Sequence, residues 1–336
     1  MTQDKAPKAR PQTLSDLFNL AKENLKQRGV ERQVPSSSNY QASAQTNSKL
    51  LDSIFMEPRF MDPVKPDTSL TLFGVKMKTP AFCSAMSKPE FFSDKEMIAV
   101  VRGMGNAGSL MTLATVDSKL LQSAIDTGTP VVNMVKPYRD TDLIYKEVHD
   151  SESRGCVAVG TDIDHFYGTY RDGRPGRTDN LAPKQTDELR QVIASTKLPF
   201  IIKGILSVED AKKAVEMGAA AVVVSNHGWG AFDFGVPAVV ALPKVAKVIG
   251  KQTTVLVDGL RTGNDVFKAL ALGAKGVGFA NSIVMAASAG GAEGVQQFIG
   301  FITGELQRTM AICGCPRLAA IDRSLLVVSP EIKPWW

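Results

Sequence analysis

The sequence lacks the long apolar runs and basic patches that mark membrane proteins and nucleic-acid-binding proteins. No run approaches the ~20 apolar residues that cross a bilayer. The polar start, MTQDKAPKARPQ, has no apolar segment of the kind found in signal peptides. Lys and Arg are interspersed with Asp and Glu, and no basic stripe contains aromatic residues. We therefore expect a soluble, cytoplasmic protein that binds neither membrane nor nucleic acid.

Cysteine and histidine are scarce as well, with four and three residues in the chain. Cys83 and Cys156 fall in apolar, strand-like runs, where cysteine usually acts as a small buried hydrophobic residue. Cys313 and Cys315 are separated by one residue, which is too close for the common zinc pairing, and no second pair accompanies them. We expect reduced thiols and no metal site.

What the chain does contain is a regular alternation of short apolar runs with amphipathic helical stretches. Strands that are apolar on both faces and alternate with helices indicate a buried parallel sheet. Eight such units in one series predict an α/β fold, a (β/α)8 TIM barrel, which 336 residues with 44% hydrophobic content can support. The alternative is an open doubly wound sheet, but that fold favours a glycine-rich first turn, and here the turn reads CSAMSKPE. The predicted strands are Pro80–Ser84, Ser109–Leu113, Val131–Val135, Cys156–Thr161, Phe200–Lys203, Ala221–Ser225, Thr254–Val257 and Gly276–Phe279.

The predicted organisation is an N-terminal arm over residues 1–49 and a barrel over residues 50–336. The arm combines one helix, Leu14–Lys26, with a loop over residues 31–49 that is rich in Ser, Gln and Asn. The run SLTLFGVKMKTP alternates around a glycine and predicts a β-hairpin that enters the barrel. The longest irregular stretch, residues 162–185, predicts a lid. The barrel helices are predicted at residues 94–105, 118–126, 140–149, 186–195, 208–217, 239–249, 263–272 and 293–310.

Candidate catalytic side chains lie where the predicted strands end, because barrel active sites form there. Lys203 closes the fifth strand and either holds an anionic ligand atom or extends to solvent. His227 follows the sixth strand, where a general base is commonly found, although a hydrogen-bonded loop histidine is the plainer alternative. Asp258 and Arg261 close the seventh strand. With the backbone of residues 278–281 they fit a phosphate cradle, or they form a local ion pair.

Several motifs in order resemble the FMN-dependent L-2-hydroxy-acid oxidase family, which includes glycolate oxidase, lactate oxidase and flavocytochrome b2. The strongest are PFIIKGILSVEDAKKAVEMGAAAVVVSNHG and VDGLRTGNDVFKALALGAKGVGFANS. FITGELQRTMAICGCPRL resembles the last helix of that family, and RFMDPVKPDTSLTLFGVKMKTPAFCSAM its entry hairpin and first strand. The resemblance covers roughly residues 50–325 and is weaker between residues 112 and 199.

The resemblance implies FMN at the barrel mouth and a role for each matching residue. His227 would be the base that removes the hydroxyl proton or the α-proton of the substrate. Lys203 would place a positive charge beside the flavin, where it stabilises the anionic reduced ring. The residues implied to contact the cofactor are Cys83, Ser84, Ala85, Thr112, Asn133, Lys203, Ser225, Asp258, Gly259, Arg261, Gly278 and Asn281.

The chain departs from the family mainly in the residues that hold substrate. The arginine that binds the substrate carboxylate is replaced by Gly230, and Asn281 stands where the family has an arginine to the phosphate. The expected tyrosine after the third strand falls on Val135, and an aromatic residue after the second on Val116. The substrate contacts predicted in their place are His165, Arg171 and Trp229.

The carboxylate that pairs with the catalytic histidine is a separate departure. The aligned position falls near Gly160, so Asp162 takes that role in our prediction, with Asp164 as the alternative.

These observations predict an FMN-dependent oxidoreductase that acts on an alcohol or similar C–H donor, with an atypical substrate. Dioxygen or an electron carrier would reoxidise the flavin, and the family resemblance implies a homo-oligomer, specifically a tetramer. The alternatives are a non-redox barrel enzyme, such as a flavin-assisted isomerase or a phosphate-ligand lyase, and a degenerate flavin-binding scaffold.

Overall fold

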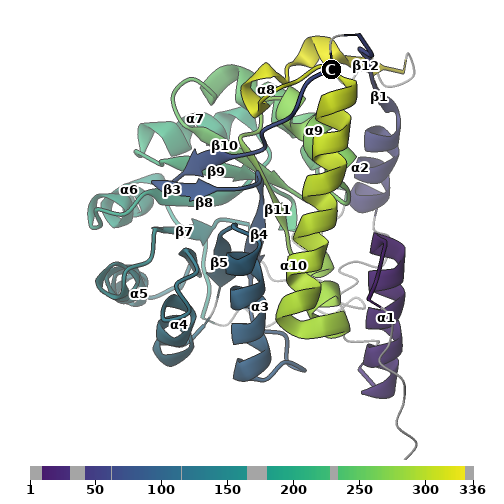
Figure 1. Ribbon diagram of the computed structural model, residues 1–336. Helices are drawn as coiled ribbons and strands as arrows, with labels where there is room; N and C mark the ends of the chain where they lie inside the picture. The colour runs from purple at the N-terminus through teal and green to yellow at the C-terminus, as the bar shows by residue number, and fades with distance from the viewer. Residues whose placement is uncertain are drawn as a thin grey trace, which may run out of the picture.

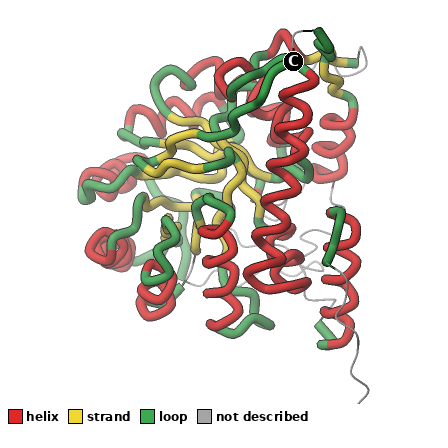
Figure 2. The backbone as a smooth tube through the Cα atoms, viewed as in Figure 1, coloured by secondary structure: helices red, strands yellow, loops and turns green. Residues whose placement is uncertain are grey.

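The computed structural model describes residues 10–30, 42–61, 63–114, 116–164, 180–227 and 234–329. Eight parallel strands close into a barrel in the order β10-β11-β4-β5-β6-β7-β8-β9, and helices surround it (Figures 1 and 2). The predicted barrel is confirmed, and every predicted strand end lies within two residues of an observed one. The strands are β4 (Ala81–Met86), β5 (Met111–Ala114), β6 (Val131–Val135), β7 (Ala158–Asp162), β8 (Phe200–Ile205), β9 (Ala221–Val224), β10 (Thr254–Asp258) and β11 (Gly276–Phe279).

The outer helices follow the predicted order, with two differences in their bounds: the third ends at Arg154 and not at residue 149, and the last begins earlier than predicted. The final helix begins at Asn281, where the prediction began at residue 293. Gly290 and Gly291 have non-helical backbone angles, so two helical segments meet there at a kink, and the glycines hid the first segment from sequence analysis. The helices are α3 (Asp94–Asn106), α4 (Ser118–Ile125), α5 (Thr141–Arg154), α6 (Thr186–Ala194), α7 (Val208–Glu216), α8 (Ala238–Ile249), α9 (Gly263–Ala271) and α10 (Asn281–Ile312).

The barrel interior is packed with apolar side chains and closed at its amino end by a hairpin. Inward-facing residues such as Phe82, Met134 and Ile201 form one cluster with the hairpin residues Leu72 and Met77. The hairpin pairs β2 (Leu70–Leu72) with β3 (Val75–Met77). Its turn residues 73 and 74 both have positive φ, as a two-residue hairpin turn requires. The predicted entry hairpin therefore fills one end of the barrel and leaves the other end for chemistry.

The N-terminal arm contains two helices where one was predicted. α1 (Leu14–Gln27) lies alongside α10 (Figure 1), and Asn24 donates to the carbonyls of Ser288 and Ala289 at the kink. α2 (Ala42–Asp52) occupies part of the predicted loop and runs past residue 49, the predicted boundary. The polar composition of α2 gave no helical pattern of apolar residues, so the sequence did not predict this helix. Tertiary hydrogen bonds stabilise it instead: Asn47 donates to the carbonyl of Gly259 and accepts from the N–H of Val239.

Two segments that are far apart in the sequence meet in a small sheet outside the barrel. β1 (Ile54–Met56) pairs antiparallel with β12 (Leu326–Val328), after two short 3-10 turns, Leu318–Ala320 and Arg323–Leu325. Among the described residues, no helix combines the length and apolar character that spanning a membrane requires.

Candidate active site

Lys203 projects from the carboxyl end of β8 into the barrel mouth. It is buried, and its ammonium lies 3.2 Å from His227 Nδ1, 3.5 Å from Asp162 Oδ1 and 3.8 Å from Asp258 Oδ2. Burial alone would lower the pKa of Lys203, but Asp162, Asp258 and Asp164 raise it above its usual value. The structure therefore holds a fixed positive charge at the mouth.

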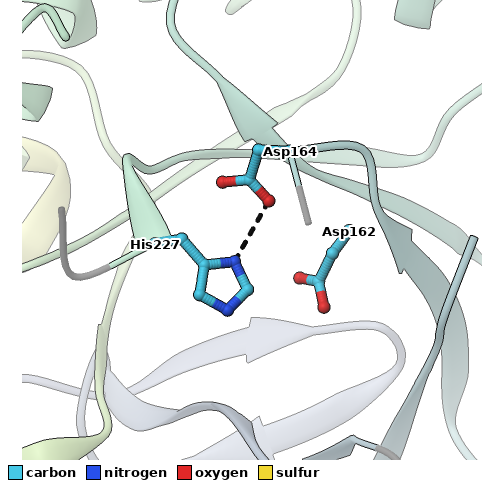
Figure 3. A group of neighbouring side chains, drawn as sticks. All are labelled: Asp162, Asp164 and His227. Carbon is cyan, nitrogen blue, oxygen red and sulfur yellow. Dashed lines mark hydrogen bonds and ion pairs between the residues drawn. The ribbon is translucent and has the colours of Figure 1, made fainter. Parts of the chain in front are cut away.

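His227 follows β9 in an unusual backbone conformation. Its φ is 55°, a region that non-glycine residues seldom occupy and that is often found at functional sites. The N–H of His227 donates to Ser225 Oγ at 3.0 Å, which fixes the backbone as the chain leaves the strand. The ring Nδ1 lies 3.0 Å from Asp164 Oδ1 (Figure 3).

The Nδ1 atom of His227 faces two groups that require opposite protonation states of it. A lysine ammonium only donates hydrogen bonds, whereas an ionised carboxylate only accepts them. Asp164 has no other hydrogen-bond donor among the described residues, while Lys203 already has Asp162 and Asp258 as counter-ions. We therefore assign the proton to Nδ1, donated to Asp164. Nε2 then carries the lone pair that can accept a substrate proton.

The carboxylate bonded to His227 is Asp164, the alternative of the sequence analysis, and not Asp162. Asp162 ends β7 and accepts from Lys136 Nζ at 2.8 Å. Figure 3 shows the Asp162 carboxylate beside the imidazole, without a bond between them. The chain turns after the strand and brings Asp164 over Gly204, where a Cβ would lie 2.6 Å from its Cγ. The alternation of side chains along β7 extends only to Asp162, so it could not predict that the turn after the strand brings Asp164 to His227.

Both carboxylates are held ionised by neighbouring cations. Burial alone would raise the pKa of Asp162, but Lys136, Lys203 and His227 lower it far below its usual value. Burial also opposes ionisation of Asp164, and His227 and Lys203 lower its pKa. The two groups therefore remain negative at neutral pH.

Lys136 is a site residue that the sequence analysis missed. In β6, Val135 packs in the outer cluster, and Asn133 donates to Ser151 Oγ of α5 at 2.9 Å. Asn133 therefore points away from the mouth, which contradicts its predicted contact with the flavin ring. The next inward position is Lys136, which is only 7% exposed and is bonded to Asp162. Strict alternation from Met134, an inward-facing residue, would have found it.

Several buried polar atoms at the mouth lack a hydrogen bond among the described residues. They include Asp162 Oδ1 and Asp164 Oδ2, and the side-chain nitrogen of Asn226, next to His227, also lacks a bond. Buried polar groups are normally satisfied, so such a concentration at one place indicates a site that receives a ligand. Asn226 was not among the predicted site residues.

The predicted ring-side contacts lie where the first two barrel strands reach the mouth. Ser84, Ala85 and Thr112 line a narrow cavity together with Lys203. Ser84 Oγ also donates to Asp258 Oδ2 at 2.8 Å, which links the first strand to the seventh. The Cys83 side chain points into the outer cluster, and burial raises the pKa of its thiol to about 12. Only the backbone of Cys83 can therefore serve the predicted contact.

The predicted phosphate side is arranged differently from the expectation. Arg261 is paired with Asp52 at 2.6 Å and with Asp265 at 3.0 Å, and not with Asp258. The local ion pair considered in the sequence analysis therefore has other partners. Gly259 has a φ of 81°, which the turn after β10 requires.

The end of β11 completes this side. A Cβ on Gly278 would lie 2.8 Å from that of Ser84, so this glycine makes room inside the barrel. Asn281 is the first residue of α10, and its position at a helix N-terminus suits an anion.

The mouth fits a flavin better at its ring side than at its phosphate side. At the ring side, the buried Lys203 lines a cavity whose other walls are mostly apolar, and the unsatisfied oxygens of Asp162 and Asp164 lie on residues that contact Lys203 and His227. At the phosphate side, the turn at Gly259 and the start of α10 offer backbone N–H groups, but the Arg261 guanidinium is engaged by two carboxylates. The predicted cofactor therefore fits, with a weaker anchor for its phosphate.

The cluster of Asp162, Asp164 and His227 also has the ligand types that bind a divalent cation. Ligand atoms of Asp162, Asp164 and His227 lie within 4.8 Å of one another. The ammonium groups of Lys136 and Lys203, however, face the two oxygens of Asp162. Positive charge already occupies the neighbourhood in which an ion would be held, so we assign these carboxylates to the lysines and the histidine.

Three predicted substrate contacts, His165, Arg171 and Trp229, lie outside the described residues, as does Gly230. The described part of the site is thus the flavin-facing half and the base.

Comparisons with known proteins agree with this geometry. The family model described as FMN-dependent dehydrogenase matches residues 21–185 and 176–328. The 4-hydroxymandelate oxidase of Amycolatopsis orientalis is 30% identical over 84% of this chain and 89% of its own length. Glycolate oxidase 1 of Zea mays is 29% identical over 85% of this chain and 88% of its own.

A crystal structure of mandelate oxidase superposes with a TM-score of 0.84 at 28% identity, covering 95% of this chain and 99% of the other. The barrel fold, the family match and the superposition all indicate the same family. The chain belongs to the FMN-dependent dehydrogenase family, and its cofactor is FMN.

Proposed function

We propose that this chain is an FMN-dependent oxidoreductase of the 2-hydroxy-acid oxidase type in which His227 is the catalytic base. The observation that carries the assignment is the contact chain Asp164–His227–Lys203, which joins a base to a fixed cation at the mouth. The donor loses two electrons and two protons as its C–OH becomes a carbonyl group. His227 Nε2 would take one of these protons, from the hydroxyl or from the carbon, and the other proton would pass to bound FMN together with the two electrons.

The neighbours of His227 prepare it for this proton transfer. Asp164 accepts from Nδ1, which orients the ring and stabilises the imidazolium that forms. Lys203 supplies a positive charge that is already in place before the reaction, so no reorganisation is needed when negative charge develops beside it. FMN supplies the two-electron acceptor when bound at the mouth.

The proposed cofactor contacts fall into a ring group and a phosphate group. Ser84, Ala85, Thr112 and the backbone of Cys83 serve the ring, and Ser225, which accepts from the N–H of His227, is a further proposed contact. The backbone of residues 278–281 with Asp258, Gly259 and Arg261 serves the ribityl chain and phosphate. Asn133 is excluded from the first group by its bond to Ser151.

The remaining assignments depend on the family and on residues outside the described ranges. We infer that His165, Arg171 and Trp229 contact the substrate. The curated relatives named as oxidases support dioxygen as the acceptor, with an electron carrier as the alternative. A cytoplasmic location and a homotetramer complete the proposal.

The proposed function is tested by mixing the purified yellow protein anaerobically with glycolate, lactate and mandelate and following the flavin absorbance. Reduction by at least one donor is expected in wild type and not in His227→Asn, which should still bind FMN. A wild-type protein that takes up FMN but is reduced by no alcohol donor contradicts the proposed function. A colourless protein that takes up no FMN contradicts the cofactor as well.

A further inference from the structure

The barrel mouth carries more buried negative charge than positive charge. Among the described residues, two ammonium groups, Lys136 and Lys203, face three carboxylates, Asp162, Asp164 and Asp258. Ser84 donates to the Asp258 carboxylate, which contributes no charge. With His227 neutral the sum is −1, and a protonated His227 brings it to zero. A second anion entering this mouth would meet no excess of cations among the residues that the structure describes.

Two acceptor atoms in this group are incompletely satisfied among the described residues. Asp162 Oδ1 has only the loose contact with Lys203 at 3.5 Å, and Asp162 is fully buried. Asp164 Oδ2 has no hydrogen bond among the described residues. Buried carboxylate oxygens require donors. A ligand that satisfies them must bring O–H or N–H groups, and a carboxylate brings none.

The sequence removes the cation that the family uses at this place. Position 230 is glycine, which has no side chain and thus no charge wherever its backbone lies. Lys136 is the remaining buried cation beside Lys203 in the described part of the mouth, and its ammonium is already bonded to Asp162 at 2.8 Å. The described residues thus offer acceptors beside the base, not a carboxylate clamp.

We propose that the substrate is uncharged next to its reacting carbon and carries there a second hydrogen-bond donor, a hydroxyl or an amide N–H, that Asp162 and Asp164 accept. This inference rests on the proposed function and narrows it from hydroxy acids to neutral hydroxy compounds, such as 2-hydroxy amides and vicinal diols.

The competing interpretation gives Lys136 the carboxylate-binding role. A lysine ammonium has three donors, and Asp162 uses one of them. Binding a substrate carboxylate there would place two anions on one ammonium, with Asp164 and Asp258 close by. This arrangement is electrostatically poorer, and the experiment below separates the two interpretations.

The test compares 2-hydroxy-2-phenylacetate with its amide, a pair of nearly equal size that differs in charge and in donors. Anaerobic flavin reduction is measured for both, and the ratio of kcat/KM for amide to acid is the readout. We expect wild type to favour the amide by about tenfold or more. Asp162→Asn, which removes one negative charge, should shift the ratio towards the acid by about tenfold. Asp126→Asn, an exposed change at the other end of the barrel, should leave the ratio unchanged.

A binding measurement keeps the inference testable if neither compound reduces the flavin. The dissociation constants of the corresponding 2-oxo acid and 2-oxo amide are then compared by perturbation of the oxidised flavin spectrum. Tighter binding of the amide supports the inference although the proposed function has failed with these donors. Tighter binding of the acid, or no binding of either, overturns it.

Lys136→Met decides the competing interpretation. If wild type prefers the acid and this variant selectively loses activity on the acid while retaining it on the amide, Lys136 is a carboxylate clamp and the inference is wrong. If the variant keeps the preference for the amide, Lys136 is the ion-pair partner of Asp162 and does not bind the substrate.

Discussion

The two sides of the barrel mouth differ in how their charges are used. On the side of β6 to β9, Lys136, Asp162, Lys203 and His227 contact one another, and the charges converge on the place of reaction. On the side of β10 and β11, the Arg261 guanidinium pairs with Asp52, which is exposed, and with Asp265, which is buried. The comparison teaches that buried charges face one another on the first side, whereas the guanidinium of the second side is paired with two carboxylates, and we propose that this side anchors phosphate more weakly.

The largest expected effect comes from removing the base. His227→Asn keeps a polar side chain but cannot accept a proton, so flavin reduction by a donor should slow by about 10²- to 10⁴-fold. Stopped-flow absorbance measures the rate, and the dissociation constant for FMN is the control. A rate within threefold of wild type would show that the base lies elsewhere.

A large effect on stability is expected from breaking the buried pair on the base side. Lys136→Met leaves Asp162 with only its looser contact to Lys203, and loss of one partner of a buried ion pair costs about 3–5 kcal/mol. The free energy of unfolding in urea is the measurement, with Lys146→Met on the exposed face of α5 as control. The double variant with Asp162→Asn should recover much of the loss, and failure to recover would mean that the two side chains are not coupled.

The pH dependence of the free energy of unfolding should reflect the ionisation of Asp162 and Asp164, on the same side of the mouth as Lys136. The pKa values of Asp162 and Asp164 are lowered in the folded state, so their contribution is fully present above the unfolded value, near pH 4. It is lost as the pH falls through the folded values, at up to about 1.4 kcal/mol per pH unit for each group. Urea unfolding of Asp162→Asn between pH 5 and pH 2 should therefore show a shallower loss than wild type. An equal slope contradicts the assignment.

A smaller effect is expected from restoring charge on the phosphate side. Asn281→Arg places a cation at the start of α10, and a charge-assisted hydrogen bond of about 1.5 kcal/mol corresponds to FMN binding about tenfold tighter. Flavin fluorescence titration gives the dissociation constant, and Asn281→Met controls for side-chain size. Unchanged affinity in the arginine variant would place the phosphate away from this turn.

The smallest effect is expected at the surface partner of Arg261. Asp52→Asn removes an exposed ion pair worth at most about 1 kcal/mol, so FMN affinity should rise no more than about fivefold as the guanidinium becomes available to phosphate. Asp187→Asn, an exposed carboxylate on α6, is the control. Weaker FMN binding in Asp52→Asn would mean that this ion pair orients Arg261 for the phosphate.

Sequence reasoning succeeded where local periodicity carries the information. The eight apolar runs, the entry hairpin and the strand-end positions of Lys203 and His227 all follow from patterns within short windows, and the structure places them as expected. It failed at α2 and at the start of α10. A polar helix held by tertiary hydrogen bonds, and a helix interrupted by two glycines, give weak local signals.

Within the site, the sequence by itself determined which chemistry the chain carries: a lysine and a histidine at adjacent strand ends, and a glycine in place of the carboxylate-binding arginine. Only the tertiary structure decided the pairings. In the structure, Asp164 is hydrogen-bonded to His227, Asp162 is paired with Lys136 and Lys203, and Arg261 is paired with Asp52. These partners lie on different strands and helices, far apart in the chain. Barrel closure and side-chain alternation fix their distances, which no short stretch of sequence encodes.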